Sequence, residues 1–381
     1  MQLRLGRRIV VTLAVVSILA ILAGLYMLRK VILNNPNPKY VDSETDFDSV
    51  MINRASNTNS LFHLVKKVEL KGTTFSYIKK FSILPSGEIV VLSSSVSLFD
   101  SSGNFLRSIG RIGGGPGEYV RPMDMTTDSA CNIYVLDTSH WRIVVFDTAG
   151  VFKFDFPLKA LADQLVIGHD RVFAYTPASM YQSLMATCYS AKNGKELFQF
   201  APPTKFLGEF KKNNMPSVFG VTGYLSWQGN DLYMIHPFEY TIREFDYHGR
   251  EIHDFQGESG SFVPVDPHKT FSMTGVPADF YPTLLMRVLA WRGLIFVVIQ
   301  NIRSMKFYLD IYTAFGKKLN TSSLSFEGFQ PNLMSLTVDG KDKFYCTYQP
   351  EPKDLSKIPN PEILVYHFTP LTEKKPIDFN K

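Results

Sequence analysis

GRIGGGPGEYVRPMDMTTDSACNIYVLDTSHWRIVVFDTAG, Gly110–Gly150, is the stretch of sequence that decides the fold. Its second half contains three apolar runs, MDMTT, NIYVLD and RIVVFD, separated by short polar turns. Val, Ile, Tyr and Phe favour strands, whereas Asp, Asn, Ser and Gly favour turns. An antiparallel meander of this size is one blade of a β-propeller, so the same pattern has to recur along the chain.

The pattern recurs in six repeats. Each begins with a turn and an apolar run, for example PSGEIVVL from Pro85 and QGNDLYMI from Gln228, and a third apolar run follows. The mean spacing is about 51 residues, near that of common propeller blades. A fourth run, such as FLRSIG in the first repeat, is present in five repeats and missing from the sixth. The sequence therefore predicts an all-β, six-bladed propeller of four-stranded antiparallel blades.

A strand upstream of the first repeat supplies the missing element. The run HLVKKVEL, His63–Leu70, belongs to no repeat of its own. An incomplete blade would leave an unpaired edge in the ring. We therefore expect this N-terminal strand to become the outer strand of the sixth blade and to close the ring.

The N-terminal segment predicts a membrane anchor. Ile9–Leu28 carries no charge and is long enough to cross a hydrocarbon core of ~30 Å. More basic residues precede it than follow it, which favours a cytoplasmic N-terminus and an exported remainder. A cleaved signal peptide is the alternative, although no Ala-x-Ala site ends the run. The predicted parts are a cytoplasmic N-terminus (1–8), a transmembrane anchor (9–28), a tether (29–59), the propeller (60–370) and a C-terminal tail (371–381).

Composition excludes several classes of function. The net charge of +5 is modest for 381 residues, and part of it flanks the apolar run, so no nucleic-acid partner is expected. The cysteines, Cys131, Cys188 and Cys346, are odd in number, far apart and without metal-ligand spacing. No metal site and no cofactor are predicted.

Two motifs resemble known propellers. IYVLDTSHWRIVVFDTAG resembles the NHL-type blade, in which Asp follows the second strand and Asn or His precedes Arg-Ile at the third. GRIGGGPGEY resembles the GPGEY element of a bacterial family of exported six-bladed propellers. The resemblance covers residues 60–370 and implies a fold and an extracytoplasmic compartment, with no agreed chemistry. Many members resemble lipoproteins, whereas this chain has no lipobox cysteine.

The glycine-rich segment is interpreted as structural. A phosphate-binding loop needs a strand before it, a helix after it and usually a Lys-Ser/Thr pair, whereas here a strand follows and no lysine is present. We expect a tight loop between blades, tied down by its acidic residue, and a second loop bridged by a hydrogen bond or ion pair. The predicted structural residues are Gly113, Gly115, Pro116, Gly117, Glu118, Asp137 and Arg142.

Loop lengths predict where a partner binds. The long connections Gly110–Pro122, Ala201–Val221, Gly257–Pro282 and Gln349–Pro361 all fall on one face of a propeller, and the other face has only tight turns. Long loops on a rigid scaffold commonly carry binding residues. The predicted contacts are the aromatic, His and Arg side chains of this face: Tyr119, Arg121, His140, Trp141, Tyr181, His236, Phe238, Tyr240 and Arg303.

The predicted function is that of a single-pass, exported binding module of the bacterial cell envelope. Its propeller would lie on the periplasmic side and hold a protein, peptide or glycan partner on the long-loop face. The alternative is a metal-dependent hydrolase or lyase of the lactonase or amidating-lyase type, with Glu118, Asp124 and Asp163 as ligands of an axial metal. Fold analogy alone supports that alternative. A purely structural envelope component is a third possibility.

Overall fold

A computed structural model describes residues 62–73, 78–176, 183–212, 223–260, 262–265, 283–301, 306–323, 332–339, 343–350 and 359–368. The chain divides into two compact units, Met1–Asn53 and Arg54–Lys381, and the described residues belong to the second. The predicted cytoplasmic N-terminus, anchor, tether and C-terminal tail lie outside the described residues. Within the described ranges, no helix has the length and apolar character needed to span a membrane.

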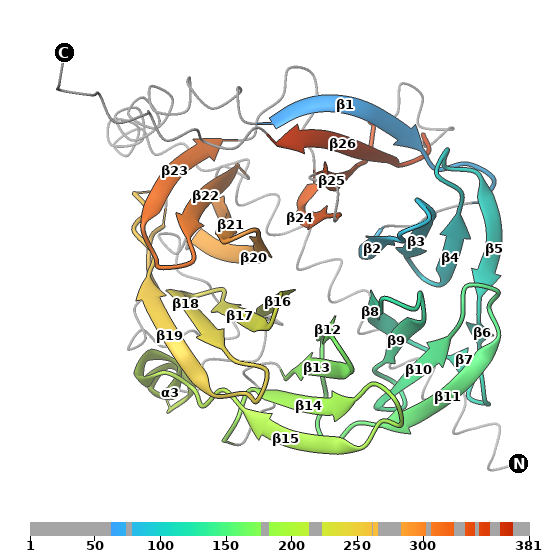
Figure 1. Cartoon of the computed structure of the whole chain (residues 1–381), viewed down its shortest axis with the longest axis horizontal. Helices are drawn as coiled ribbons and strands as arrows, with labels where there is room; N and C mark the ends of the chain where they lie inside the picture. The colour runs from blue at the N-terminus through green and yellow to red at the C-terminus, as the bar shows by residue number, and fades with distance from the viewer. Residues whose placement is uncertain are drawn as a thin grey trace, which may run out of the picture. The chain divides into compact units, whose positions relative to one another are not determined.

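Six four-stranded antiparallel sheets form a ring in the second unit (Figure 1). The first five blades are consecutive in sequence: β2 (Lys80–Ile83) to β5 (Phe105–Ile109), β8 (Pro122–Thr127) to β11 (Phe152–Pro157), β12 (Gln164–Gly168) to β15 (Glu196–Phe200), β16 (Tyr224–Gln228) to β19 (Glu251–Gln256), and β20 (Thr283–Trp291) to β23 (Lys318–Ser323). Each of these blades has two middle strands. They are β3 (Ile89–Leu92) and β4 (Val96–Phe99) in the first blade, β9 (Ile133–Asp137) and β10 (Arg142–Phe146) in the second, and β13 (Arg171–Tyr175) and β14 (Ala186–Ser190) in the third. In the fourth they are β17 (Asp231–His236) and β18 (Glu239–Phe245), and in the fifth β21 (Leu294–Asn301) and β22 (Phe307–Thr313). The predicted architecture is confirmed.

The sixth blade joins the two ends of the propeller. Its order is β1 (Phe62–Glu69), β26 (Glu362–Phe368), β25 (Lys343–Tyr348) and β24 (Asn332–Val338), so the N-terminal strand lies outermost, as predicted. Phe62 pairs with Phe368 at one end of the ladder and Glu69 with Glu362 at the other. Backbone hydrogen bonds and side-chain packing both close the ring.

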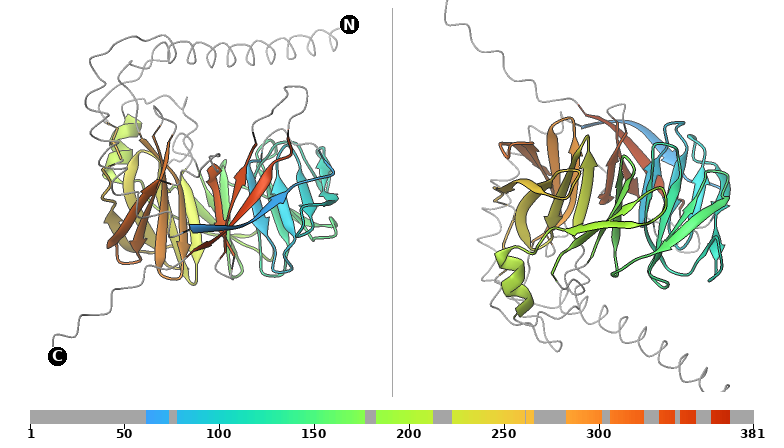
Figure 2. Two further views of the ribbon diagram at one scale, coloured as in Figure 1. Left: turned by 90° about the horizontal axis from the view of Figure 1, so that it is seen from above. Right: turned by 60° about the horizontal axis from the view of Figure 1, so that its bottom comes forward.

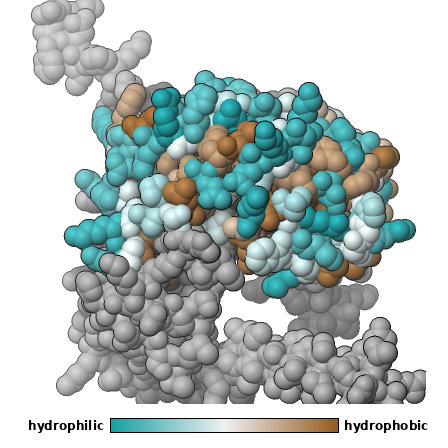
Figure 3. Space-filling model, turned by 90° about the horizontal axis from the view of Figure 1, so that it is seen from below, coloured by the Kyte–Doolittle hydropathy of each residue, from teal (hydrophilic) through white to brown (hydrophobic). Residues whose placement is uncertain are grey.

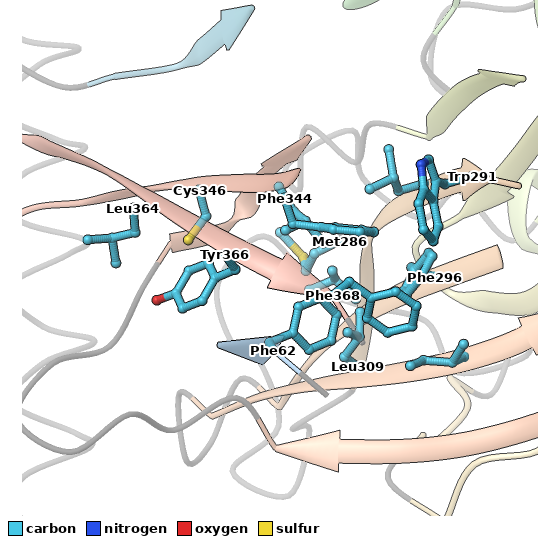
Figure 4. Close-up of a cluster of buried hydrophobic side chains, with 14 residues drawn as sticks. Phe62, Met286, Trp291, Phe296, Leu309, Phe344, Cys346, Leu364, Tyr366 and Phe368 are labelled. Carbon is cyan, nitrogen blue, oxygen red and sulfur yellow. The ribbon is translucent and has the colours of Figure 1, made fainter. Parts of the chain in front are cut away.

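Aromatic side chains fill the space behind this closing strand (Figure 4). The Phe62 ring lies 5.3 Å from that of Phe344 in an edge-to-face arrangement and 5.0 Å from that of Phe368. Trp291, from the fifth blade, packs edge-on against Phe344 at 5.4 Å. Edge-to-face contacts match the quadrupoles of the rings, so this cluster joins the fifth and sixth blades as well as β1.

Burial follows the place of each strand in its blade. The middle strands β3, IVVL, and β9, IYVLD, are buried at every residue, because sheets of neighbouring blades cover both of their faces. The outer strand β11, FKFDFP, alternates between exposed and covered residues, as expected for a sheet edge facing water. On the side of the ring shown in Figure 3, hydrophobic residues lie between hydrophilic ones.

The two faces of the ring differ in their connections (Figure 2). One face carries the loops from each outer strand to the next blade and from the second to the third strand of each blade; we call it the long-loop face. Its described parts include 110–121, 201–212, 257–260 and 262–265, with the short strands β6 (Arg111–Ile112) and β7 (Glu118–Tyr119) and the helix α3 (Lys205–Lys212). Turns of two to five residues join the strands at the opposite face.

Candidate functional site

A buried carboxylate joins two loops of the long-loop face. Asp137, at the end of β9, has no exposed area, and its Oδ1 accepts the backbone N–H of Arg121 at 3.0 Å and of Ser139 at 3.3 Å. Its Oδ2 lies 2.8 Å from Nδ1 of His140. Burial raises the pKa of Asp137, but these hydrogen bonds outweigh burial and lower it, so the group is ionised at neutral pH. The position of the 138–141 loop is therefore fixed to that of the 110–121 loop.

The glycine-rich loop is held by Glu118 and Arg142. Glu118 accepts the backbone N–H of Gly115 and the Nε–H of Arg111, both at 2.7 Å. The Arg142 guanidinium donates to the backbone carbonyl of Glu118 at 2.9 Å and lies 3.7 Å from Asp137. A Cβ at Gly113 would lie 2.2 Å from the Glu118 carboxylate, so a larger residue there would displace this carboxylate. The carboxylate of Glu118 therefore lies against both Gly113 and Gly115.

Trp141 is the most distinctive residue that these loops present. Its side chain is 49% exposed, and its backbone has a φ of 51°, a left-handed conformation that bulky residues rarely adopt. The backbone N–H of Leu158 donates to its carbonyl at 2.6 Å, which holds the strained conformation in place. Strained residues concentrate at functional sites, where the surrounding structure compensates for their cost.

Exposed apolar and cationic side chains accompany Trp141 on the two joined loops. We call this set the Trp141 patch: Arg111, Ile112, Val120, Arg121, His140 and Trp141. Ile112 is 66% and Val120 is 45% exposed. Aromatic, apolar and Arg side chains held on a rigid frame are typical of binding hot spots. Three predicted contact residues, Arg121, His140 and Trp141, lie together here.

Tyr119 is placed differently from the prediction. Its side chain has no exposed area; its hydroxyl donates to the carbonyl of Ile109 at 2.8 Å and accepts the N–H of Val96 at 3.0 Å. Burial raises the pKa of Tyr119. The side chain therefore ties the glycine-rich loop to the first blade and offers no surface to a partner. Tyr119 is buried because apolar residues of neighbouring strands surround it, and the sequence of the GPGEY loop alone does not predict those neighbours.

His236, Phe238 and Tyr240 are also buried, at the junction of the fourth and fifth blades. They are 5%, 3% and 6% exposed. The Tyr240 hydroxyl donates to Oδ2 of the fully buried Asp310 at 2.5 Å. Nδ1 of His236 accepts the N–H of Phe238 at 3.4 Å, and burial lowers the pKa of His236 to about 3. These three residues form part of the seam between blades. The other predicted contacts, Tyr181 and Arg303, lie outside the described residues.

A ring of polar side chains surrounds the axis, and sequence reasoning missed it as a set. Five of the six innermost strands contribute one residue each, three or four positions before the last residue of the strand: Lys80, Asp124, Gln164, Tyr224 and Arg287, from the first to the fifth blade. Counting back from the tight turn that ends each inner strand would have found this set. We call it the axial layer.

Hydrogen bonds connect the side chains of the axial layer to one another and to the backbone of neighbouring blades. Oδ2 of Asp124 accepts Nζ of Lys80 at 2.8 Å and the N–H of Leu165 at 2.6 Å. Gln164 accepts the N–H of Leu225 at 2.6 Å. Arg287 interacts electrostatically with Asp124 and Tyr224. The layer is thus preorganised by four adjacent blades and contains two cations for one carboxylate.

The three carboxylates of the predicted metal alternative are used differently. Glu118 is bound by Arg111 and the glycine-rich loop, and Asp124 is bound by Lys80. Asp163 is the last residue of the loop before β12. Among the described residues, no group of three or more His, Cys, Asp or Glu side chains is placed to hold a metal ion. The donor set around the axis favours an anion over a cation.

Comparison with known proteins agrees with the fold. A predicted exported protein of Bacteroides fragilis has a TM-score of 0.58 and 14% identity, over 82% of this chain and 97% of that one. A member of the DUF4221 family from Bacteroides vulgatus has a TM-score of 0.56 and 11% identity, over 81% and 99% of the two chains. No curated protein matches the sequence. The model of one family, described as a domain of unknown function, DUF4934, matches residues 73–352, and the chain belongs to that family.

Proposed function

We propose that this protein is an exported binding module, anchored in the membrane by Ile9–Leu28, which binds a protein, peptide or glycan on its long-loop face. The Trp141 patch is the contact surface. The observation that carries the proposal is Trp141 itself, half-exposed and kept in a left-handed conformation by hydrogen-bonded neighbours. Positive φ also occurs at Cys131, His169, Ala201 and Arg292, so the conformation of Trp141 supports the proposal together with the exposure of its indole.

The frame beneath the patch supports this function. Asp137, Glu118 and Arg142 fix both loops before any partner arrives, so little conformational entropy is lost on binding. The apolar side chains of Trp141, Ile112 and Val120 supply area to bury. Arg111, 80% exposed, and Arg121 lie beside them and offer hydrogen bonds to carbonyl, carboxylate or hydroxyl groups.

A pull-down from native membranes tests the contact surface. Full-length protein with Trp141→Ala should lose its partner, because truncation of a central aromatic residue typically costs about 2 kcal/mol or more of binding free energy. The matched control is Phe315→Ala, since Phe315 is 90% exposed in a tight turn of the opposite face. Recovery of the same partner by the Trp141 variant, or its loss in the Phe315 variant, would contradict the proposed surface. Glycan-array binding of the same variants identifies a carbohydrate partner.

Protease treatment of spheroplasts tests the anchor. An uncleaved anchor with the orientation inferred from the flanking basic residues leaves the propeller accessible from outside and retained on the membrane. Removal of the propeller by external protease is the expected result. Protection of the propeller, or a mature N-terminus beyond Leu28, would contradict this topology.

A further inference from the structure

The charges of the axial layer do not balance. The layer holds two basic side chains, Lys80 and Arg287, and Asp124 is the carboxylate that faces them among the described residues; burial lowers the pKa of both basic groups. Oδ2 of that carboxylate already accepts two hydrogen bonds, from Lys80 and from the backbone of Leu165. The side chain of Lys80 is 14% exposed and that of Asp124 is 7% exposed, so water screens this excess positive charge poorly.

Arg287 has an unused donor inside the ring. Its Nε is buried and has no hydrogen-bond partner. A β-bulge between Leu285 and Arg287 interrupts the pairing of β20 with β21, and a second bulge lies between Pro122 and Asp124 in β8. Bulges re-aim side chains and are common beside functional sites. Arg287 and Asp124, which face each other across the layer, therefore both lie next to a β-bulge.

Two other arginines with little exposure, Arg243 and Arg142, each form a close ion pair with a carboxylate, whereas Arg287 has no such pair among the described residues. The Nε of Arg142 also lacks a hydrogen-bond partner, so the difference lies in the carboxylate. Arg243, 6% exposed, donates to both oxygens of Glu251 at 2.6 Å. Arg142 donates to Asp155 at 2.7 Å and to the backbone of the glycine-rich loop. A cluster with only a structural role would be completed in the same way, because a buried cation without a partner is costly.

We propose that the axial layer binds an oxyanion, the carboxylate or phosphate group of a small ligand, between Arg287 and Lys80. The planar guanidinium matches two oxygens of such a group, and the ammonium supplies a second charge. Asp124 orients Lys80 and limits the net charge of the site. Lys79 and Arg121, one and three residues closer to the long-loop face on the same two blades, attract an anion entering from that face.

Calorimetry of the purified full-length chain tests this site. Inorganic phosphate and succinate are titrated separately at constant ionic strength, and heat with one-to-one stoichiometry is expected for one of them, which identifies the kind of oxyanion. Arg287→Met should weaken that binding by about tenfold or more, because a charge-assisted pair of hydrogen bonds is lost. Arg250→Met is the matched control, since Arg250 is 77% exposed at the opposite face. Absence of binding by both anions overturns the proposal, as does unchanged binding by Arg287→Met.

Thermal unfolding without added anion separates binding from a structural role. Arg287→Met removes a buried charge that has no hydrogen bond from its Nε, so the melting temperature should stay the same or rise. A large fall in that temperature would make Arg287 structural and overturn the proposal. Asp124→Asn keeps an acceptor for Leu165 and increases the excess positive charge, so it should bind the same anion more tightly than wild type. Weaker binding by Asp124→Asn would also contradict the site.

Discussion

The carboxylate of Asp137 accepts a hydrogen bond from the backbone N–H of Arg121 at 3.0 Å, and this bond joins the two loops that form the Trp141 patch. The donor lies in the connection between the first and second blades, and the acceptor ends the second strand of the second blade. The patch therefore derives its shape from a buried charge. It follows that the frame and the contact surface can be altered separately by mutation.

Asp137→Ala should destabilise the protein more than any single change in the patch. It leaves the N–H groups of Arg121 and Ser139 without their acceptor and Arg142 without a nearby buried carboxylate. We expect a loss of about 2–4 kcal/mol in the free energy of unfolding, measured by urea denaturation. Asp155→Ala is the control: Asp155 is a half-buried partner of Arg142 and should contribute about 1 kcal/mol or less. Equal effects of the two substitutions would show that Asp137 does not organise the loops.

Phe62→Ala should weaken the closure of the ring. Phe62 is 5% exposed and packs on three aromatic rings, so its removal leaves a cavity that the surrounding β-sheets cannot fill. The expected cost is about 3–5 kcal/mol of unfolding free energy. On the same strand, Val65 is 56% exposed, and Val65→Ala should change stability by about 0.5 kcal/mol or less. Similar melting temperatures for the two variants would mean that side-chain packing at β1 contributes little.

The closing strand was predictable because the sequence signalled it twice. The sixth repeat lacked a fourth strand, and His63–Leu70 had strand character without a repeat of its own. Repeats with different residues and uneven spacing were enough to predict six blades, because turn and strand preferences are local properties. The segment found, Phe62–Glu69, differs from the prediction by one residue at each end.

The site was less predictable because it depends on contacts between distant residues. Tyr119 and Tyr240 have the residue type and the loop position of contact residues, yet neighbouring blades bury both. In the axial layer, Lys80 and Arg287 lie 207 positions apart in sequence numbering and have no common sequence pattern. Only the closed ring brings these residues, from five of the six inner strands, into one layer around the axis. The position of a residue within its repeat predicts that it belongs to this layer, but the charge and hydrogen bonding of the layer follow from the five residues together.

Stability should depend on pH through His236. The pKa of this residue is about 3 in the folded protein, because burial disfavours the charged form, and about 6.5 in the unfolded chain. Below pH 6.5 the unfolded chain binds a proton that the folded protein does not. The free energy of unfolding therefore falls by up to about 1.4 kcal/mol for each pH unit, from pH 6.5 down towards pH 3.

Denaturation at pH 7, 6 and 5 measures this dependence. His236→Asn retains a short acceptor for the N–H of Phe238 but has no titrating group, so its stability should fall less steeply with pH than that of wild type. His253→Asn is the control, since His253 is exposed on β19, and it should keep the steeper dependence. If the free energy of unfolding of His236→Asn falls with pH as steeply as that of wild type, the pH dependence comes from other groups.

Trp141→Gly should separate the strain at Trp141 from the function of its side chain. A left-handed backbone costs about 1–2 kcal/mol for a residue with a Cβ, and glycine adopts it freely. Glycine also makes the unfolded chain more flexible, which costs about 0.5–1 kcal/mol. The difference predicts that Trp141→Gly is as stable as Trp141→Ala or more stable by about 1 kcal/mol, although both lose the indole. At His140, where φ is not positive, the order should be reversed, with Gly less stable than Ala by about 0.5–1 kcal/mol. Urea denaturation measures the stability of the Gly variant relative to the Ala variant at each position. If Gly is the less stable variant at both positions, the backbone of Trp141 is not strained, and its conformation gives no support to a binding role. If the order differs between the two positions, the chain retains at Trp141 a residue that lowers its stability.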